Sequence, residues 1–188
     1  RERGRIFLHY RYDTAKLGMS ALKAGELQTG SEGAWVDRQF VIHSDDDGLT
    51  WSEPRDITAA VKPPRAERGG ASPSRGIQLR RGPHEGRLVI PYHWQWNWAQ
   101  HDSDDGSVQM RACAVYSDDH GETWRHGGLT PKPDGMPTGV AEPQMVELAD
   151  GRLLMNGRNP NLRDKRNVIW RGKGRRLAAK RAAAQDAR

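Results

Sequence analysis

The residues best placed to do chemistry in this 188-residue chain are Glu142 and Arg158, which flank a predicted β-hairpin. The hairpin is predicted because Asp150-Gly151 lies between two apolar segments, and this dipeptide is a strong signal for a tight turn. Antiparallel pairing brings Glu142 and Arg158 to the same end of the hairpin. A carboxylate and a guanidinium at one strand end form either a surface ion pair or a functional site, and the surface pair is the commoner case.

An eight-residue pattern, S-D-D-x-G-x-T-W, occurs twice, as Ser44 to Trp51 (box 1) and Ser117 to Trp124 (box 2). Its Ser and Asp side chains can hydrogen-bond the backbone N–H groups of their own turn, and its Gly tolerates the positive φ of a tight turn. The Trp is large enough to pack the returning strand on a neighbour, so we expect both Trp rings to be buried. Each box is predicted to be a hairpin turn whose structural residues are Ser44, Asp46, Gly48, Trp51, Ser117, Asp119, Gly121 and Trp124.

The carboxylates of the boxes also suggest a calcium loop. An EF-hand loop needs acidic residues at alternating positions and a Glu at its twelfth position, and neither box has that spacing. No Cys and His spacing is typical of zinc, and the single Cys113 excludes an internal disulfide. We therefore expect the boxes to be structural, and the chain to hold no metal and no cofactor.

The box pattern resembles the Asp-box, or BNR repeat, of the sialidase (neuraminidase) superfamily. This resemblance implies an all-β fold that forms part of a six-bladed β-propeller, with one box at a corner of a blade and the boxes away from the active-site face. At about 40 to 50 residues per blade, residues 1–170 hold about three to four blades. Residues 171–188 form a separate basic tail, rich in Ala and Arg, whose composition favours a short solvated helix.

The segment from Ala141 to Arg158, AEPQMVELADGRLLMNGR, is similar to the sialidase pattern E-x-Q-x-V-E-L-x-x-G-x-L-L-x-N-x-R. The resemblance implies that Glu142 is the base that deprotonates a nucleophilic Tyr, and that Arg158 belongs to a triad that grips the substrate carboxylate. A planar guanidinium suits that role, and sialidases are known to replace the usual carboxylate nucleophile by Tyr. The implied activity is that of an exo-α-sialidase, which releases terminal sialic acid, or a related anionic sugar, from glycans.

GIQL followed by GRLVIPY resembles the sialidase segment that leads into the pocket wall, and this resemblance nominates Tyr92, His93 and Trp94 as substrate-binding residues. For Trp94, Trp96 and Trp98, two interpretations stay open: alternate residues on one strand face that pack between blades, or a rim on which sugars stack. His93 is equally compatible with a polar residue that is satisfied at a strand end.

The family places its acid/base Asp and first triad Arg upstream of a strand like RIFLHY, and its Tyr and third Arg beyond position 170. Neither set is present at matching positions, so we expect the gene to encode further box sequence on both sides and the 188-residue chain to be inactive alone. An alternative function is a non-catalytic Asp-box propeller that binds glycans or a protein partner.

The net charge of +6 and the pI of 9.8 suggest a nucleic-acid partner, but the charge is concentrated in the tail. Residues 171–188 hold 7 of the 30 Lys and Arg and 1 of the 24 Asp and Glu, which leaves 23 of each in residues 1–170. We therefore expect no nucleic-acid binding by the body, and a nucleic-acid-binding tail is the weakest of the three functional hypotheses.

Apolar and β-branched segments predict strands at Arg5–Tyr12, Trp35–His43, Gly86–Tyr92 and Val108–Tyr116. Pro- and Gly-rich segments predict surface loops at residues 62–75 and 127–139. No apolar run is long enough to span a membrane and no signal-like segment is present in the given chain. A secreted or periplasmic location would fit the family resemblance.

Overall fold

The computed structural model describes residues 4–12, 28–96, 109–131 and 139–159, together with the backbone of residues 168–173 and 176–181. The prediction for Trp98 lies outside these residues. In the described part of the chain, strands dominate, and the helices are α2 (Thr58–Val61) and the 3-10 turn η1 (Gly82–His84). Neither helix is long enough to cross a membrane.

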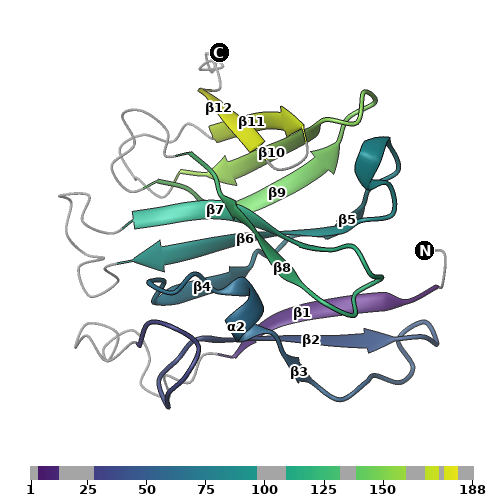
Figure 1. Ribbon diagram of the computed structural model, residues 1–188, viewed down its shortest axis with the longest axis vertical. Helices are drawn as coiled ribbons and strands as arrows, with labels where there is room; N and C mark the ends of the chain where they lie inside the picture. The colour runs from purple at the N-terminus through teal and green to yellow at the C-terminus, as the bar shows by residue number, and fades with distance from the viewer. Residues whose placement is uncertain are drawn as a thin grey trace, which may run out of the picture.

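The strands form three antiparallel sheets that follow one another along the long axis of the molecule (Figure 1). The first sheet has the order β1 (Ile6–Tyr12), β2 (Arg38–Ser44), β3 (Arg55–Asp56). The second has the order β4 (Arg68–Ala71), β6 (Leu88–Trp96), β7 (Gln109–Ser117), β8 (Arg125–Leu129), and β5 (Ile77–Gln78) also pairs with β6. The third has the order β9 (Ala141–Glu147), β10 (Leu153–Arg158), β11 (Val168–Lys173), β12 (Arg176–Arg181).

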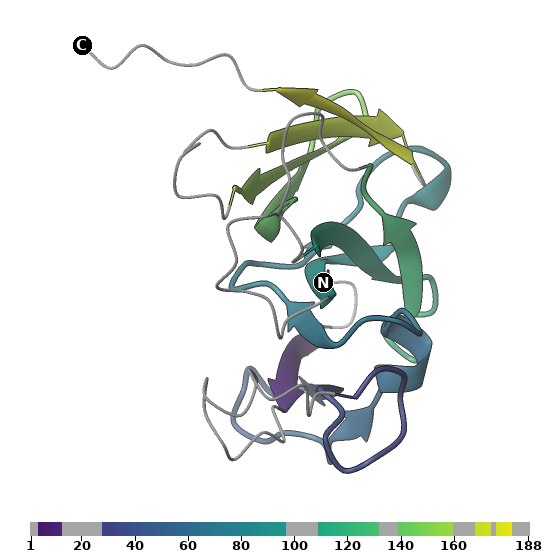
Figure 2. The ribbon, with the colours of Figure 1, turned by 90° about the vertical axis from the view of Figure 1, so that its left-hand side faces the viewer.

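The sheets share one plan, in which sequence neighbours pair as a meander, as in the blades of a propeller. The view turned by 90° keeps the same order, with β1 low and β11 and β12 high (Figure 2). The prediction of an all-β, partial β-propeller is confirmed, and the described residues form three sheets, within the predicted range of three to four blades.

Two hydrophobic clusters hold the sheets together. One joins the first and second sheets and includes Val41, Tyr92, Trp94 and Trp124. The other joins the second and third sheets and includes residues such as Val89, Ala112, Met145, Leu153 and Met155. Each cluster forms because alternate residues of a strand face the same side of its sheet.

Both boxes form the predicted turns, box 1 between β2 and β3 and box 2 between β7 and β8. In box 2 the Asp119 carboxylate accepts hydrogen bonds from the Ser117 hydroxyl (2.7 Å) and the Thr123 N–H (2.8 Å), and Gly121 N–H donates to the Ser117 hydroxyl (2.8 Å). Gly121 has φ of +90°.

Box 1 repeats these bonds at the same distances. Asp46 accepts from Ser44 (2.7 Å) and Thr50 N–H (2.8 Å), Gly48 N–H donates to Ser44 (2.8 Å), and Gly48 has φ of +91°. The hydrogen bonds that shape each turn therefore come from residues of the box itself.

The expected burial of the two Trp rings holds for one of them. Trp124 is 3% exposed, but Trp51 is 42% exposed, so the prediction for Trp51 is wrong. Trp124 packs on Phe7 and His9 of the first sheet. Trp51 instead donates its ring N–H to the carbonyl of Gly48 in its own turn (3.1 Å). The box determines the turn, whereas a neighbouring sheet is needed to bury the ring.

The predicted surface loop at residues 62–75 contains strand β4, which pairs with the end of β6. Gly69 and Gly70 lie in this strand with φ of +141° and +149°. A Cβ on Gly69 would clash with the carbonyl of His93, and one on Gly70 would clash with the side-chain carbonyl of Gln39. The two glycines that suggested a loop therefore permit a close strand contact.

The helix favoured for the tail is also wrong, because residues 176–181 form β12 and pair with β11 from Val168↔Arg181 to Lys173↔Arg176. Strand β11 runs across position 170, the predicted boundary of the tail. An open strand edge offers a row of N–H and C=O groups, and pairing with it outweighs the helix propensity of Ala and Arg.

Candidate functional site

Glu142 and Arg158 lie at the ends of the strands that are far from the boxes. Box 2 follows the pair Leu88↔Ser117 at one end of β6, whereas His93 lies toward the other end, where β4 joins. Arg158 pairs with Ala141 at the matching end of the third sheet. In Figure 1 the turns that follow β2 and β7 lie toward the right, whereas the start of β9 and the end of β10 lie toward the left.

The alternation of β9 and β10 places the candidate residues on one exposed face. In β9, Ala141, Pro143 and Met145 are buried while Glu142 and Gln144 are exposed. In β10, Asn156 and Arg158 are exposed, and Asn156 pairs directly with Gln144. The predicted site therefore has a floor of polar side chains from two neighbouring strands.

Glu142 and Arg158 form a two-pronged ion pair. Arg158 Nε donates to Glu142 Oε2 (2.5 Å), and Arg158 Nη2 donates to Oε1 (3.0 Å). The side chains are 42% and 51% exposed, respectively. Their hydrogen bond is the main reason that the pKa of Glu142 is lowered, and burial, the next largest effect, acts in the opposite direction. Glu142 is therefore an accessible carboxylate at neutral pH.

The backbone at this pair is irregular. Glu142 has φ of +47°, which L-residues with a side chain rarely adopt, and the β9–β10 register shifts between Asn156 and Arg158. A bulge re-aims side chains at a strand end, and a positive φ costs about 1–2 kcal/mol for a residue other than Gly. Such strain is concentrated at functional sites.

His93 lies beside the pair on β6. Burial, followed by the positive charge of Arg11, lowers its pKa to about 4, and Glu142, Arg158 and Arg68 also act on it electrostatically. The imidazole is therefore neutral at pH 7. Its Nδ1 is buried and has no hydrogen-bond partner among the described residues.

The sequence did not single out Arg11 and Arg68, which supply positive charge around His93. Arg11 Nε lies 3.5 Å from Oδ1 of the buried Asp37, whose Oδ2 accepts a hydrogen bond from Gly69 N–H (2.9 Å). Asp37 thus ties the end of β1 to β4. No sequence motif includes Arg11 or Arg68. The one feature of the sequence that could have indicated them is that each lies near the end of a strand.

Tyr92 and Trp94 do not reach this face. They alternate with His93 along β6 and are fully buried between the first and second sheets. The Tyr92 hydroxyl hydrogen-bonds His9 Nδ1 (2.9 Å), and burial raises the pKa of Tyr92 far above its usual value. The structure therefore removes both residues from the candidate binding set and supports the packing interpretation for Trp94.

The described residues contain no cluster of three or more His, Cys, Asp or Glu side chains that could hold a metal ion. The arrangement is instead a carboxylate, a guanidinium and a neutral imidazole on one face. Such a set can bind an anionic group through Arg158 and accept a proton at Glu142.

Comparison with known proteins identifies the fold family. The model of the BNR repeat-like domain matches residues 3–172. The chain belongs to the BNR repeat-like domain family. This family membership agrees with the resemblance to the sialidase superfamily.

Similar proteins include sialidases from bacteria and animals. The chain is 38% identical to a sialidase of Micromonospora viridifaciens over 160 residues, which are 85% of the chain and 22% of that protein. It is 33% identical to Sialidase-4 of Homo sapiens over 138 residues, which are 68% of the chain and 25% of that protein. Among solved structures, the Hadza microbial sialidase Hz136 has a TM-score of 0.74 at 26% identity, over 95% of the chain and 31% of that structure. The chain spans less than a third of each.

Proposed function

We propose that this chain carries the base and one carboxylate-binding Arg of an exo-sialidase-type glycoside hydrolase. The observation that carries the proposal is the Glu142–Arg158 pair, held by strained backbone on an exposed polar face away from both boxes. The similarity to sialidases supports the reaction class. The substrate class is a glycan that ends in sialic acid or a related anionic sugar.

Arg158 is suited to bind the carboxylate of such a sugar. A guanidinium has five N–H donors in a plane, and the two bonds to Glu142 use two of them. A substrate carboxylate can engage further donors or displace Glu142 from Nε and Nη2. His93 is neutral at pH 7 and lies beside the pair, so it can hydrogen-bond a polar group of the sugar.

Binding of the substrate would also activate Glu142. The bond from Arg158 lowers the pKa of Glu142 and makes it a weak base. When a substrate carboxylate engages Arg158, this stabilisation weakens, and the second negative charge nearby raises the pKa of Glu142 further. A carboxylate with a higher pKa accepts the proton of a Tyr nucleophile more readily. Recruitment of Arg158 and activation of Glu142 are thus one event.

The test is hydrolysis of a fluorogenic sialoside. We expect no detectable turnover by the 188-residue chain, because the Tyr nucleophile and the acid/base Asp of the family pattern are not at matching positions. A longer chain that includes the remaining blades should hydrolyse the substrate. In it, Glu142→Gln should lower kcat/KM by about 10²-fold or more, and Arg158→Lys should act mainly by raising KM.

Glu53→Gln is the matched control, because Glu53 is an exposed carboxylate beside box 1, far from the site. It should leave kcat/KM unchanged. Full activity of Glu142→Gln in the longer chain would remove Glu142 from the mechanism. Sialoside binding without hydrolysis by that longer chain would instead favour the non-catalytic glycan-binding propeller.

A further inference from the structure

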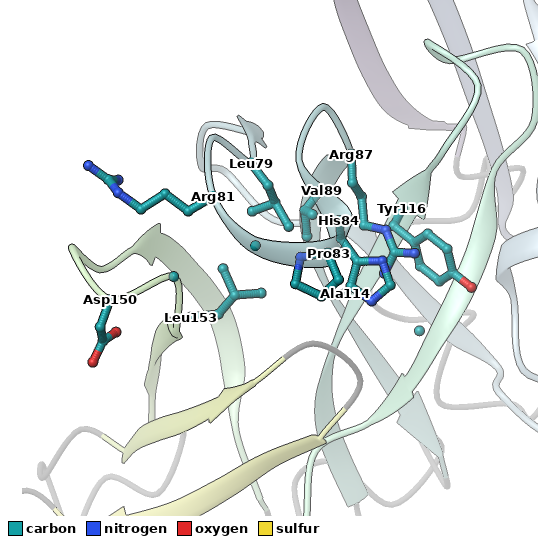
Figure 3. Close-up of a pocket in the computed structure, with 13 residues that line it drawn as sticks. Leu79, Arg81, Pro83, His84, Arg87, Val89, Ala114, Tyr116, Asp150 and Leu153 are labelled. Carbon is teal, nitrogen blue, oxygen red and sulfur yellow. The ribbon is translucent and has the colours of Figure 1, made fainter.

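A cavity of about 390 Å³ lies between the second and third sheets, at the end that carries the boxes. Its apolar wall comes from Leu79, Val89, Ala114, Tyr116 and Leu153. Figure 3 shows Leu79 and Leu153 on one side of this space and Ala114 and Tyr116 on the other. Arg87 lies at its rim, and the candidate site at Glu142 does not contribute to it.

The internal repeat shows which part of the first sheet corresponds to this cavity. Ile6 pairs with Ser44 at the start of box 1, and Leu88 pairs with Ser117 at the start of box 2. One residue further along, Phe7 of β1 therefore corresponds to Val89 of β6. By the same count along β2 and β7, Val41 corresponds to Ala114 and His43 to Tyr116.

In the first sheet these positions form the binding place of Trp124. The indole packs edge-on against Phe7 with ring centroids 5.7 Å apart, and Phe7 in turn contacts His43. Trp124 and Val41 belong to the same buried cluster. The corresponding residues Val89, Ala114 and Tyr116 all line the cavity. The cavity therefore repeats part of a place that an indole ring fills one sheet earlier, where His9 also contacts the ring.

The charges repeat as well. Arg5, one residue before β1, pairs with Asp45 of box 1 (2.6 Å) and also reaches Glu122 of box 2 (3.4 Å). Arg87, one residue before β6, pairs in the same way with Asp118 of box 2 (2.6 Å). Glu122, the second partner of Arg5, is two positions before Trp124. By analogy, the second partner of Arg87 would be an acidic residue two positions before a Trp that enters the cavity.

We propose that this cavity is a binding site for an indole ring, and that its occupant is a Trp carried by a box-type turn with an acidic residue two positions earlier. The sequence contains two boxes, and only Gly174 and Arg175 stand between β11 and β12, where the other two sheets have a box. The occupant is therefore a peptide segment with the chemistry of box 2, presented to the apolar wall with its acidic residue toward Arg87.

The experiment is a ¹⁹F NMR titration of the 188-residue chain with 5-fluoroindole and, separately, with a cyclised SDDHGETW peptide. For a ligand as small as indole we expect saturable binding with a Kd on the order of 1 mM. The peptide should compete with 5-fluoroindole and bind at least about tenfold tighter. A matched peptide with Ala in place of Trp should not compete.

Two variants should fill the cavity. Ala114→Phe and Ala114→Leu each add apolar side-chain volume to its wall. Each should reduce 5-fluoroindole binding more than about tenfold. If one variant fails to fold, the binding of 5-fluoroindole by the other variant decides the test. Arg87→Met should weaken binding of the peptide more than binding of 5-fluoroindole, because only the peptide brings an acidic residue.

Trp124→Ala provides a positive control, because it empties the equivalent place in the first sheet. This variant should bind two equivalents of 5-fluoroindole, and the wild-type chain should bind one. Absence of saturable binding to the wild-type chain, undiminished binding by folded Ala114→Phe or Ala114→Leu, or competition by the Trp-free peptide would each overturn the proposal.

Discussion

The two ends of the sheets hold their carboxylates in different ways. At the box end, Asp46 and Asp119 accept hydrogen bonds from Ser and Thr residues within four positions of them. At the other end, Glu142 is held by Arg158, 16 residues away on a neighbouring strand, and has a strained backbone. The first arrangement stabilises a turn, whereas the second leaves an exposed anion and cation that a ligand can separate. Location and partner, more than residue type, distinguish the structural carboxylates from the candidate catalytic one.

The largest expected effect tests the box end. Trp124→Ala should lower the free energy of unfolding by about 3–5 kcal/mol, because it removes a large buried ring and leaves a cavity. Trp51→Ala should cost less than about 1 kcal/mol, because Trp51 is half-exposed and contacts its own turn. Urea unfolding of both variants measures the difference. Equal losses would show that burial by the neighbouring sheet does not distinguish the boxes.

A smaller effect, of opposite sign, is expected at Glu142. Glu142→Gly should raise the free energy of unfolding by about 1 kcal/mol, because Gly adopts positive φ without strain and the exposed ion pair contributes only about 0–1 kcal/mol. Glu142→Ala is the control, since it removes the same pair but keeps a Cβ and the strain. Urea unfolding should give Glu142→Gly a higher free energy of unfolding than both the wild type and Glu142→Ala. If Glu142→Gly is no more stable than Glu142→Ala, the backbone at Glu142 is not strained.

The acid dependence of stability should come from the box end. The pKa of Asp46 is about 2 because of hydrogen bonds led by the Thr50 hydroxyl, and that of Asp119 is about 2 because bonds from Thr123 and Ser117 outweigh the effect of burial. These values lie below the ordinary pKa of about 4. The stabilisation is therefore present above about pH 4 and is lost as the pH falls toward 2.

The urea midpoint of the wild-type chain should accordingly fall between pH 4 and pH 2. An Asp46→Asn, Asp119→Asn double variant should show a flatter profile over that range, while Glu142→Gln should keep most of the wild-type slope. Identical profiles for the double variant and the wild type would mean that the box carboxylates do not carry this dependence.

The features that could be predicted from sequence are those that depend on local patterns. The box turns follow from Ser, Asp, Gly and Thr contacts inside eight residues, and the Glu142–Arg158 contact follows from a hairpin around Asp150-Gly151. The features that could not be predicted depend on what lies beside an element. Trp51 and Trp124 stand in the same motif, yet only Trp124 meets a neighbouring sheet.

Strand β4 was missed because Gly69 and Gly70 carry no side-chain pattern, although they are required by close contact with β6 and Gln39. Tyr92 and Trp94 were assigned to a pocket wall because the motif does not show which face of β6 is covered. Residues of β12 have a helical composition, and their strand form depends on pairing with β11. In each case the deciding partner is distant in sequence.

The most direct test of the proposed site is the pKa of Glu142 with and without a sialic acid. Carboxyl ¹³C NMR of the 188-residue chain should show a pKa of Glu142 below its usual range, and saturation with N-acetylneuraminic acid should raise it as the sugar carboxylate engages Arg158. The methyl ester of the same sugar, which lacks the charge, should leave it unchanged, and Asp119 should not respond to either ligand. A pKa of Glu142 that does not move when N-acetylneuraminic acid binds, or that moves equally with the ester, would contradict the assignment of Arg158 and Glu142 to one carboxylate-responsive site.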